Sequence, residues 1–174
     1  MQRQEISNKI KVTMVSQKFE GCPEKDIKFY RKYAAVAFKT LTNPLFQRFI
    51  NWIILKENIN EHMITTIQIR AFPFRKQNGN GLAGKFNKKG KIVIYPKRLE
   101  FCKKLMQETE KENVYCYIKA RARATLIHEL LHVKYSNDED KVRQLTRKYI
   151  RIFTRHRNSQ DSNAKHILRT LFSH

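Results

Sequence analysis

The sequence predicts an α+β fold, and three observations support this class. Apolar residues recur every three or four positions in several long segments, which is typical of helices. Two shorter segments, residues 63–72 and 91–96, are rich in β-branched residues and are each closed by a proline, which is typical of strands. The chain has 174 residues, of which 41% are hydrophobic, and this is enough to bury a real core.

In chain order, the first half is expected to contain a weak strand over 6–14, helices over 23–41 and 45–57, a strand over 63–72, a loop over 78–90 and a strand over 91–96. Pro23 begins the first helix, because proline and the acids behind it favour a first helical turn. Asn43-Pro44 ends that helix. The loop is predicted because four of the five glycines lie between Asn78 and Gly90.

The second half is expected to be helical. One helix is predicted from Leu99 to about Lys111. A longer one covers residues 114–135, and a last one near 138–153 begins after the turn at Asn137-Asp138. Residues 1–155 are interpreted as a single domain, and residues 156–174 as a basic C-terminal tail.

The charge balance is strongly basic. Lys and Arg number 36 and Asp and Glu 15, so the formal net charge is +21, which predicts attraction to polyanions such as nucleic acid. Residues 141–174 alone hold nine basic residues and one acid, and are interpreted as either a solvated helix face and tail or a polyanion-binding arm. The sequence shows no apolar run of membrane-spanning length, no secretory leader and no CxxC pair, so a cytoplasmic protein without a membrane partner is expected.

One motif carries chemistry. The pattern His-Glu-x-x-His begins at His128, within the longest predicted helix. Four residues advance a helix by about 400°, so the imidazoles of His128 and His132 emerge about 40° and ~6 Å apart, as two ligands of a tetrahedral zinc require. Glu129 lies close enough to take a proton from a zinc-bound water of pKa about 7. The alternative is that both histidines belong to the core and that Glu129 pairs with a nearby arginine, Arg121 or Arg123.

With this motif on a helix that follows two strands, the chain resembles the zincin metallopeptidases over about residues 60–153. In size and arrangement it is most similar to the small archaeal minigluzincins, which are of the gluzincin type. The resemblance implies a zinc-dependent endopeptidase in which Glu129 acts as general base and later protonates the leaving amine. It also implies a small mixed sheet whose edge strand, expected near 91–96, pairs with the backbone of a peptide or protein substrate.

A third metal ligand is implied beside His128 and His132. In gluzincins this ligand is a Glu on the following helix, which corresponds to Glu139. The longer metzincin pattern instead places its last ligand at Asp138, but Tyr135 stands where that pattern has a glycine. Glu139 is therefore preferred and Asp138 remains the alternative, since acids that bind no metal would simply complement the helix dipole.

Three further hypotheses concern regulation and partners. In minigluzincins a C-terminal segment can block the cleft, so residues 164–172, which carry a short apolar stripe, are expected to cover it in a latent form. A second hypothesis adds nucleic-acid binding to the catalytic site, as in SprT-like proteases, although those use a His as third ligand and this chain has none in the matching place. The third is a non-enzymatic basic nucleic-acid-binding protein.

Overall fold

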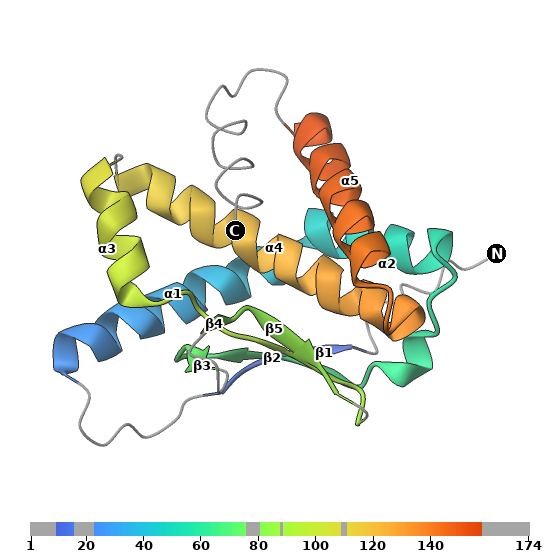
Figure 1. The fold of residues 1–174 in the computed structure, drawn as a ribbon, viewed down its shortest axis with the longest axis horizontal. Helices are drawn as coiled ribbons and strands as arrows, with labels where there is room; N and C mark the ends of the chain where they lie inside the picture. Colours follow the sequence, from blue (N-terminus) through green and yellow to red (C-terminus); the bar gives the residue numbers. More distant parts are fainter. Residues whose placement is uncertain (1–9, 16–22, 76–80, 88, 109–110, 158–174) are drawn as a thin grey trace.

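Helices cover one face of a small sheet in this mixed α+β fold (Figure 1). The structure is a computed structural model, and it describes residues 10–15, 23–75, 81–87, 89–108 and 111–157. The helices are α1 (Glu24–Leu41), α2 (Pro44–Lys56), α3 (Leu99–Glu108), α4 (Lys111–Tyr135) and α5 (Glu139–Arg157), with a short 3-10 helix at Glu61–Met63. The strands are β1 (Lys11–Val15), β2 (Thr66–Arg70), β3 (Phe74–Arg75), β4 (Gly81–Leu82), β5 (Gly84–Phe86) and β6 (Lys91–Ile94).

Four strands form the main sheet in the order β1-β2-β6-β5. The first three run parallel, and β5 runs antiparallel to β6 with Gly84 opposite Ile94. The β3–β4 pair is a separate antiparallel hairpin. Among the strands described, β5 therefore forms one edge of the sheet and β1 the other.

The helices pack on the sheet in two groups. α1 lies over β1 and β2, while α4 lies over β6 and β5. β2 buries Ile67 and Ile69 and leaves the residues between them half-exposed, so its alternation directs one face into the core. α5 packs on α4, and α2 meets α5 through aromatic contacts such as Phe46 with Phe153, whose ring centres lie 5.3 Å apart.

α4 is the central helix of the fold. Its second half buries Leu126, Ile127, Leu130 and Leu131, each no more than 2% exposed. Nearer its start, Tyr117 belongs to a second apolar cluster that α4 shares with α1 and α3. A helix that is apolar on several sides is expected to be enclosed by its neighbours, and here those neighbours are the sheet, α1, α3 and α5.

A polar cluster links the ends of three helices. Glu57, the residue that ends α2, accepts hydrogen bonds from the hydroxyl of Tyr135 at 2.7 Å and from the hydroxyl of Tyr149. Burial would raise the pKa of Glu57, but the two hydrogen bonds and the charges of Lys134 and Lys148 together outweigh it, and the pKa is lowered. Because Tyr135 ends α4 and Tyr149 lies on α5, one ionised carboxylate fixes how α2, α4 and α5 meet.

The expected loop over 78–90 is wrong, because β4 and β5 lie within it. The turn after β5 explains the difference. The side chain of Asn87 accepts from the backbone N–H groups of Lys89 at 3.1 Å and Lys91 at 3.0 Å, and Gly90 takes a φ of 74°, which glycine adopts at little cost. The chain thus reverses, and β5 pairs with β6.

The expected edge strand near 91–96 is wrong for the same reason. β6 lies between β2 and β5, and Ile92, Val93 and Ile94 are all buried, as befits an interior strand. The strand that forms this edge is β5, which brings Gly84 and Phe86 to the place expected for the segment 91–96.

The α+β class and the expected helices are confirmed, with bounds that shift by a few residues. The strand expected over 63–72 is shorter, and the helix expected near 138–153 continues to Arg157, past the boundary expected at 155. Residues 158–174, which include most of the predicted tail and the segment 164–172, lie outside the described residues. In the part of the chain that is described, no helix combines the length and the apolar character needed to cross a bilayer.

Candidate metal centre

His128, His132 and Glu139 come together at the junction of α4 and α5, with one candidate ligand atom from each within 4.8 Å of the others. The Nε2 atoms of the two histidines lie 3.1 Å apart, and Glu139 oxygens lie 3.7 Å from His128 Nε2 and 3.3 Å from His132 Nε2. A tetrahedral ion with ligands at about 2.1 Å separates them by about 3.4 Å. The three side chains therefore fit around a small metal ion with little movement.

Hydrogen bonding and burial prepare the imidazoles for this role. His132 Nδ1 lies 3.1 Å from the carbonyl oxygen of Ser136, which can only accept, so Nδ1 carries the proton and Nε2 presents its lone pair. Burial, together with the neighbouring His132, lowers the pKa of His128. At neutral pH His128 is therefore uncharged, the form in which imidazole binds a metal.

The turn between the helices separates the roles of Asp138 and Glu139. Asp138 caps α5, since its side chain accepts from the backbone N–H of Lys141 at 3.0 Å. Its own N–H donates to the carbonyl of Tyr135 at 2.7 Å, which closes a tight turn after α4. This turn places Glu139, in the first turn of α5, beside the histidines, whereas the Asp138 carboxylate serves the cap.

Arg143 holds the Glu139 carboxylate. One turn further along α5, its Nε donates to Glu139 Oε1 at 2.8 Å. Glu139 Oε2 is the oxygen nearest His132. Although both side chains are partly exposed, with 62% of Arg143 and 45% of Glu139 accessible, the bond leaves one oxygen turned toward the imidazoles. Arg143 is thus a partner that orients a candidate ligand.

Glu129 lies inside the molecule at the edge strand. It is 7% exposed, and its Oε2 accepts a hydrogen bond from the backbone N–H of Phe86 at 2.8 Å. Phe86 is the last residue of β5, so the carboxylate of α4 is held against the edge of the sheet. In the sequence it directly follows His128, so on α4 its side chain leaves the helix about 100° away from that of His128.

Gly84 permits this close approach of β5 to α4. A Cβ atom at position 84 would lie 2.6 Å from Thr125 Cγ2 and 2.8 Å from both Cγ and Oε1 of Glu129. Such distances are shorter than real carbon contacts, and the atoms they meet are buried. Only glycine at this position lets the strand lie so close to the carboxylate.

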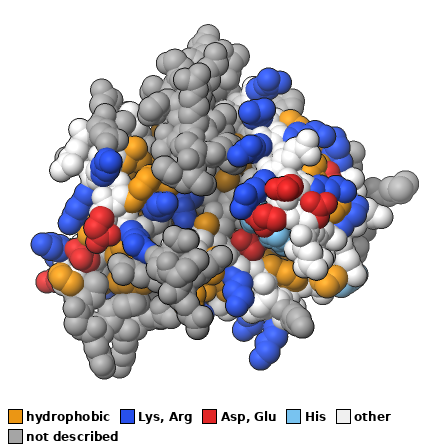
Figure 2. All heavy atoms as spheres, viewed as in Figure 1, with side chains coloured by type: hydrophobic (Ala, Val, Ile, Leu, Met, Phe, Trp, Pro, Cys, Tyr) orange, Lys and Arg blue, Asp and Glu red, His pale blue; other side chains and the backbone are white. Residues whose placement is uncertain are grey.

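In the alternative interpretation, both histidines belong to the core and Glu129 pairs with Arg121 or Arg123. The side chains of His128 and His132 are 26% and 19% exposed, so both reach the surface. Arg121, one of the arginines expected to pair with Glu129, donates instead to the carbonyl of Tyr95 at 2.6 Å. Arg123 lies over the rings of Phe46 and Phe153. In Figure 2, acidic side chains gather beside exposed histidine atoms and are surrounded by Lys and Arg.

Three residues of the site were not among those expected from the sequence: Gly84, Phe86 and Arg143. The spacing of four between Glu139 and Arg143 is a recognisable helical ion pair. The alternation of Leu82 and Phe86 before a turn containing glycine also indicates a hairpin. The sequence around Gly84 contains no signal that this glycine faces a carboxylate.

Comparison of the chain with protein-family models, with curated proteins and with solved structures finds no match.

Replacing Gly84 with Ala is expected to lower the free energy of unfolding by about 1–3 kcal/mol, because the new methyl group overlaps Thr125 and Glu129. Gly81→Ala is the matched control, since a Cβ there meets nothing within 4 Å, and its effect should stay below about 1 kcal/mol. Urea unfolding followed by circular dichroism measures both. Equal stability of the two variants would contradict the close contact.

Replacing Arg143 with Gln is expected to weaken Zn²⁺ binding by about tenfold or more, because Glu139 loses the partner that orients it. Arg147→Gln, one helical turn further along α5, removes the same charge without touching Glu139 and should leave the affinity equal or slightly higher. Competition with a chromophoric chelator measures both affinities. An affinity of Arg143→Gln equal to that of Arg147→Gln would remove the orienting role.

Proposed function

We propose that this chain is a zinc-dependent peptidase whose metal is bound by His128, His132 and Glu139. The observation that carries the proposal is the convergence of these three side chains, two of them from α4, on which the buried Glu129 directly follows His128. Two imidazoles and one carboxylate are a ligand set that suits zinc, and three protein ligands leave a fourth position open, as in catalytic rather than structural zinc sites. When bound, zinc would lower the pKa of a water to about 7 and polarise a carbonyl oxygen.

Glu129 is the general base in this proposal. Its Oε2 is held by Phe86 N–H, and in the sequence it directly follows the candidate ligand His128. It can accept the proton of an attacking water and then donate that proton to the amine of the cleaved peptide bond. The hydrogen bond from Phe86 restricts the rotation of the side chain and so holds it ready for both transfers.

The edge strand β5 offers a place for a peptide. Asn87 N–H donates to Lys91 O at 3.0 Å, and Tyr95 N–H donates to Ala83 O at 2.9 Å. Because hydrogen-bonded pairs alternate in an antiparallel ladder, Gly84 and Phe86 direct their backbone groups away from β6. The N–H of Phe86 is used by Glu129. The carbonyl groups of Gly84 and Phe86 and the N–H of Gly84 can therefore pair with an extended chain, which would lie beside the general base.

The proposal also draws on the resemblance to minigluzincins, which implies an edge strand beside the helix that carries the motif. An edge strand next to the helix with the His-Glu-x-x-His motif was expected at 91–96, and β5 takes that place. Endopeptidase activity and zinc as the metal are parts of the proposal and rest on the same ligand chemistry, whereas latency is implied by the resemblance alone, since the segment 164–172 lies outside the described residues.

Replacing Glu129 with Gln is expected to preserve zinc binding and reduce hydrolysis by about 10²–10⁴-fold, because Gln can accept the hydrogen bond from Phe86 but cannot take a proton. The substrate is a mixture of peptides from digested proteins, rich in acidic as well as apolar sequences, and cleavage is followed by mass spectrometry. Glu24→Gln, an exposed change on α1, is the control.

Two results would contradict the proposal. Cleavage by Glu129→Gln at the rate of the unchanged protein would exclude this residue as the base. Absence of cleavage of every peptide by the zinc-loaded protein, with the site metal verified, would exclude peptidase activity toward these substrates and leave a metal-binding protein.

A further inference from the structure

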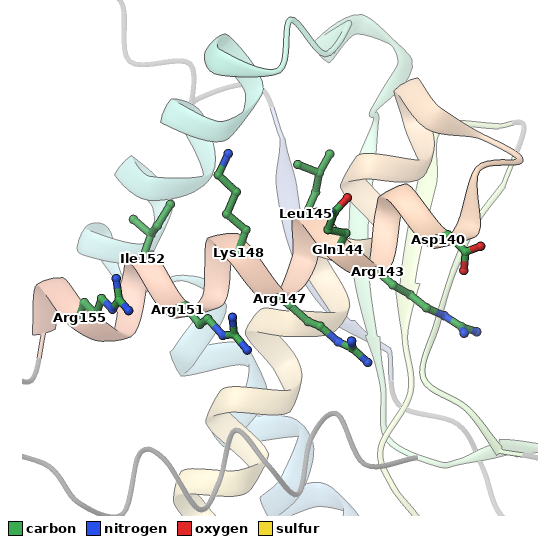
Figure 3. A pocket seen from close by; sticks show the side chains of 9 residues that line it. All are labelled: Asp140, Arg143, Gln144, Leu145, Arg147, Lys148, Arg151, Ile152 and Arg155. Atoms are coloured by element: carbon green, nitrogen blue, oxygen red, sulfur yellow. The ribbon is translucent and has the colours of Figure 1, made fainter.

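α5 presents a row of arginines, of which the first, Arg143, also orients Glu139 at the candidate metal centre. Arg143, Arg147, Arg151 and Arg155 follow one another at intervals of four residues, and all four are exposed. In Figure 3 the side chains of Arg143, Arg147 and Arg151 leave one side of α5, whereas Leu145, Lys148 and Ile152 point to the opposite side. Each step of four residues turns the row by about 40°, so Arg155 lies further round the helix. Figure 2 shows Lys and Arg gathered in a row over this helix.

No acid interrupts the row. Between Lys141 and Arg157 the sequence holds seven basic residues and no Asp or Glu. Only the first turn of α5 is acidic, through Glu139 and Asp140. At this acidic end the row begins with Arg143, which donates to Glu139, so the positive face extends from the candidate metal centre along the rest of the helix.

We propose that this arginine row, Arg143-Arg147-Arg151-Arg155, binds the sugar-phosphate backbone of nucleic acid. Each interval of four residues is a rise of about 6 Å, so the row is about 18 Å long. Over that length a DNA duplex carries about ten phosphates, enough for every guanidinium to meet one. Arg presents a planar fork of donors that matches the oxygens of a phosphate.

A hollow lies along α5. Its volume is about 900 Å³, and all the described residues that line it belong to α5, five of them basic. Contacts to phosphates carry no information about the bases, so the binding is expected to be independent of the nucleic-acid sequence.

Nucleic acid fits the charge of the chain better than an acidic peptide. α5 carries seven basic and two acidic residues, a net charge of +5, and the chain carries +21. The remaining +16 lies elsewhere, where a short peptide bound along α5 would not reach it. A long polyanion gains from the whole field, because it is attracted at a distance and then contacts the row.

The test compares Arg147→Gln/Arg151→Gln/Arg155→Gln with a control of equal charge change on α1, Lys25→Gln/Arg31→Gln/Lys39→Gln. All six side chains are exposed, and neither variant touches the metal cluster. Circular dichroism verifies that both fold. Binding to a labelled DNA duplex of about 30 base pairs, and to the corresponding RNA, is measured by fluorescence anisotropy from about 50 to 200 mM salt.

The unchanged protein is expected to bind with an affinity that falls steeply with salt. The α5 variant should bind at least about tenfold more weakly, with a log–log salt slope shallower by about 2.7 for the duplex, since each lost phosphate contact contributes about 0.9. The α1 variant should change much less. This outcome does not depend on zinc or on peptidase activity.

Three outcomes would overturn the proposal. The first is no binding of DNA or RNA even at the lowest salt. The second is equal weakening in the two variants, which would show that only total charge matters. The third is displacement of the duplex by poly-glutamate as effectively as by unlabelled duplex of equal charge, which would assign the row to acidic polypeptides.

Discussion

The second half of α4 is buried against the sheet on one side and against α5 on another, and this packing determines the direction of the candidate site residues that α4 carries. Leu126, Ile127, Leu130 and Leu131 occupy the core, so the helix cannot rotate without exposing them. His128 and His132 then emerge toward the start of α5, and Glu129 toward β5. Glu57, bound by Tyr135 and Tyr149, fixes the same junction from the far side.

The charges at the junction of α4 and α5 act differently on the two proposed ligands, a metal cation and a polyanion. The positive end of the α5 dipole and the arginines behind it attract an anion and repel a cation. Binding of a metal must therefore depend on direct coordination by the two imidazoles and the carboxylate, not on the surrounding field. The same arginines, which oppose a cation, suit a polyanion, so the metal and the nucleic acid that we propose would bind to different parts of α5.

Much of this could be predicted from the sequence, because the relevant signals are periodic. The spacing of the apolar residues predicts α4, and the spacing of four predicts that His128 and His132 share a side of it. The choice between Asp138 and Glu139 stayed open, since both acids stand at the start of a helix. It depends on which side chain caps α5, and that is a matter of backbone geometry in a short turn.

The strand within the glycine-rich segment, residues 78–90, could not be predicted in this way. Glycine usually indicates a loop, yet Gly84 lies in a strand because the strand must approach Thr125 and Glu129 closely. That requirement arises from a helix some forty residues later in the chain, so no local pattern contains it. The wrong prediction of the edge strand has the same cause. When no strand is predicted at 84–86, the segment 91–96 is left as the outermost strand of the predicted sheet.

The zinc content of the purified protein, measured by elemental analysis together with that of His132→Ala, tests the central claim most directly. His62→Ala, which changes an exposed histidine away from the cluster, serves as the control. The account predicts one zinc per chain in the unchanged protein and in His62→Ala, and its loss in His132→Ala. Absence of zinc from the unchanged protein, after zinc has been supplied and the excess removed, would contradict it.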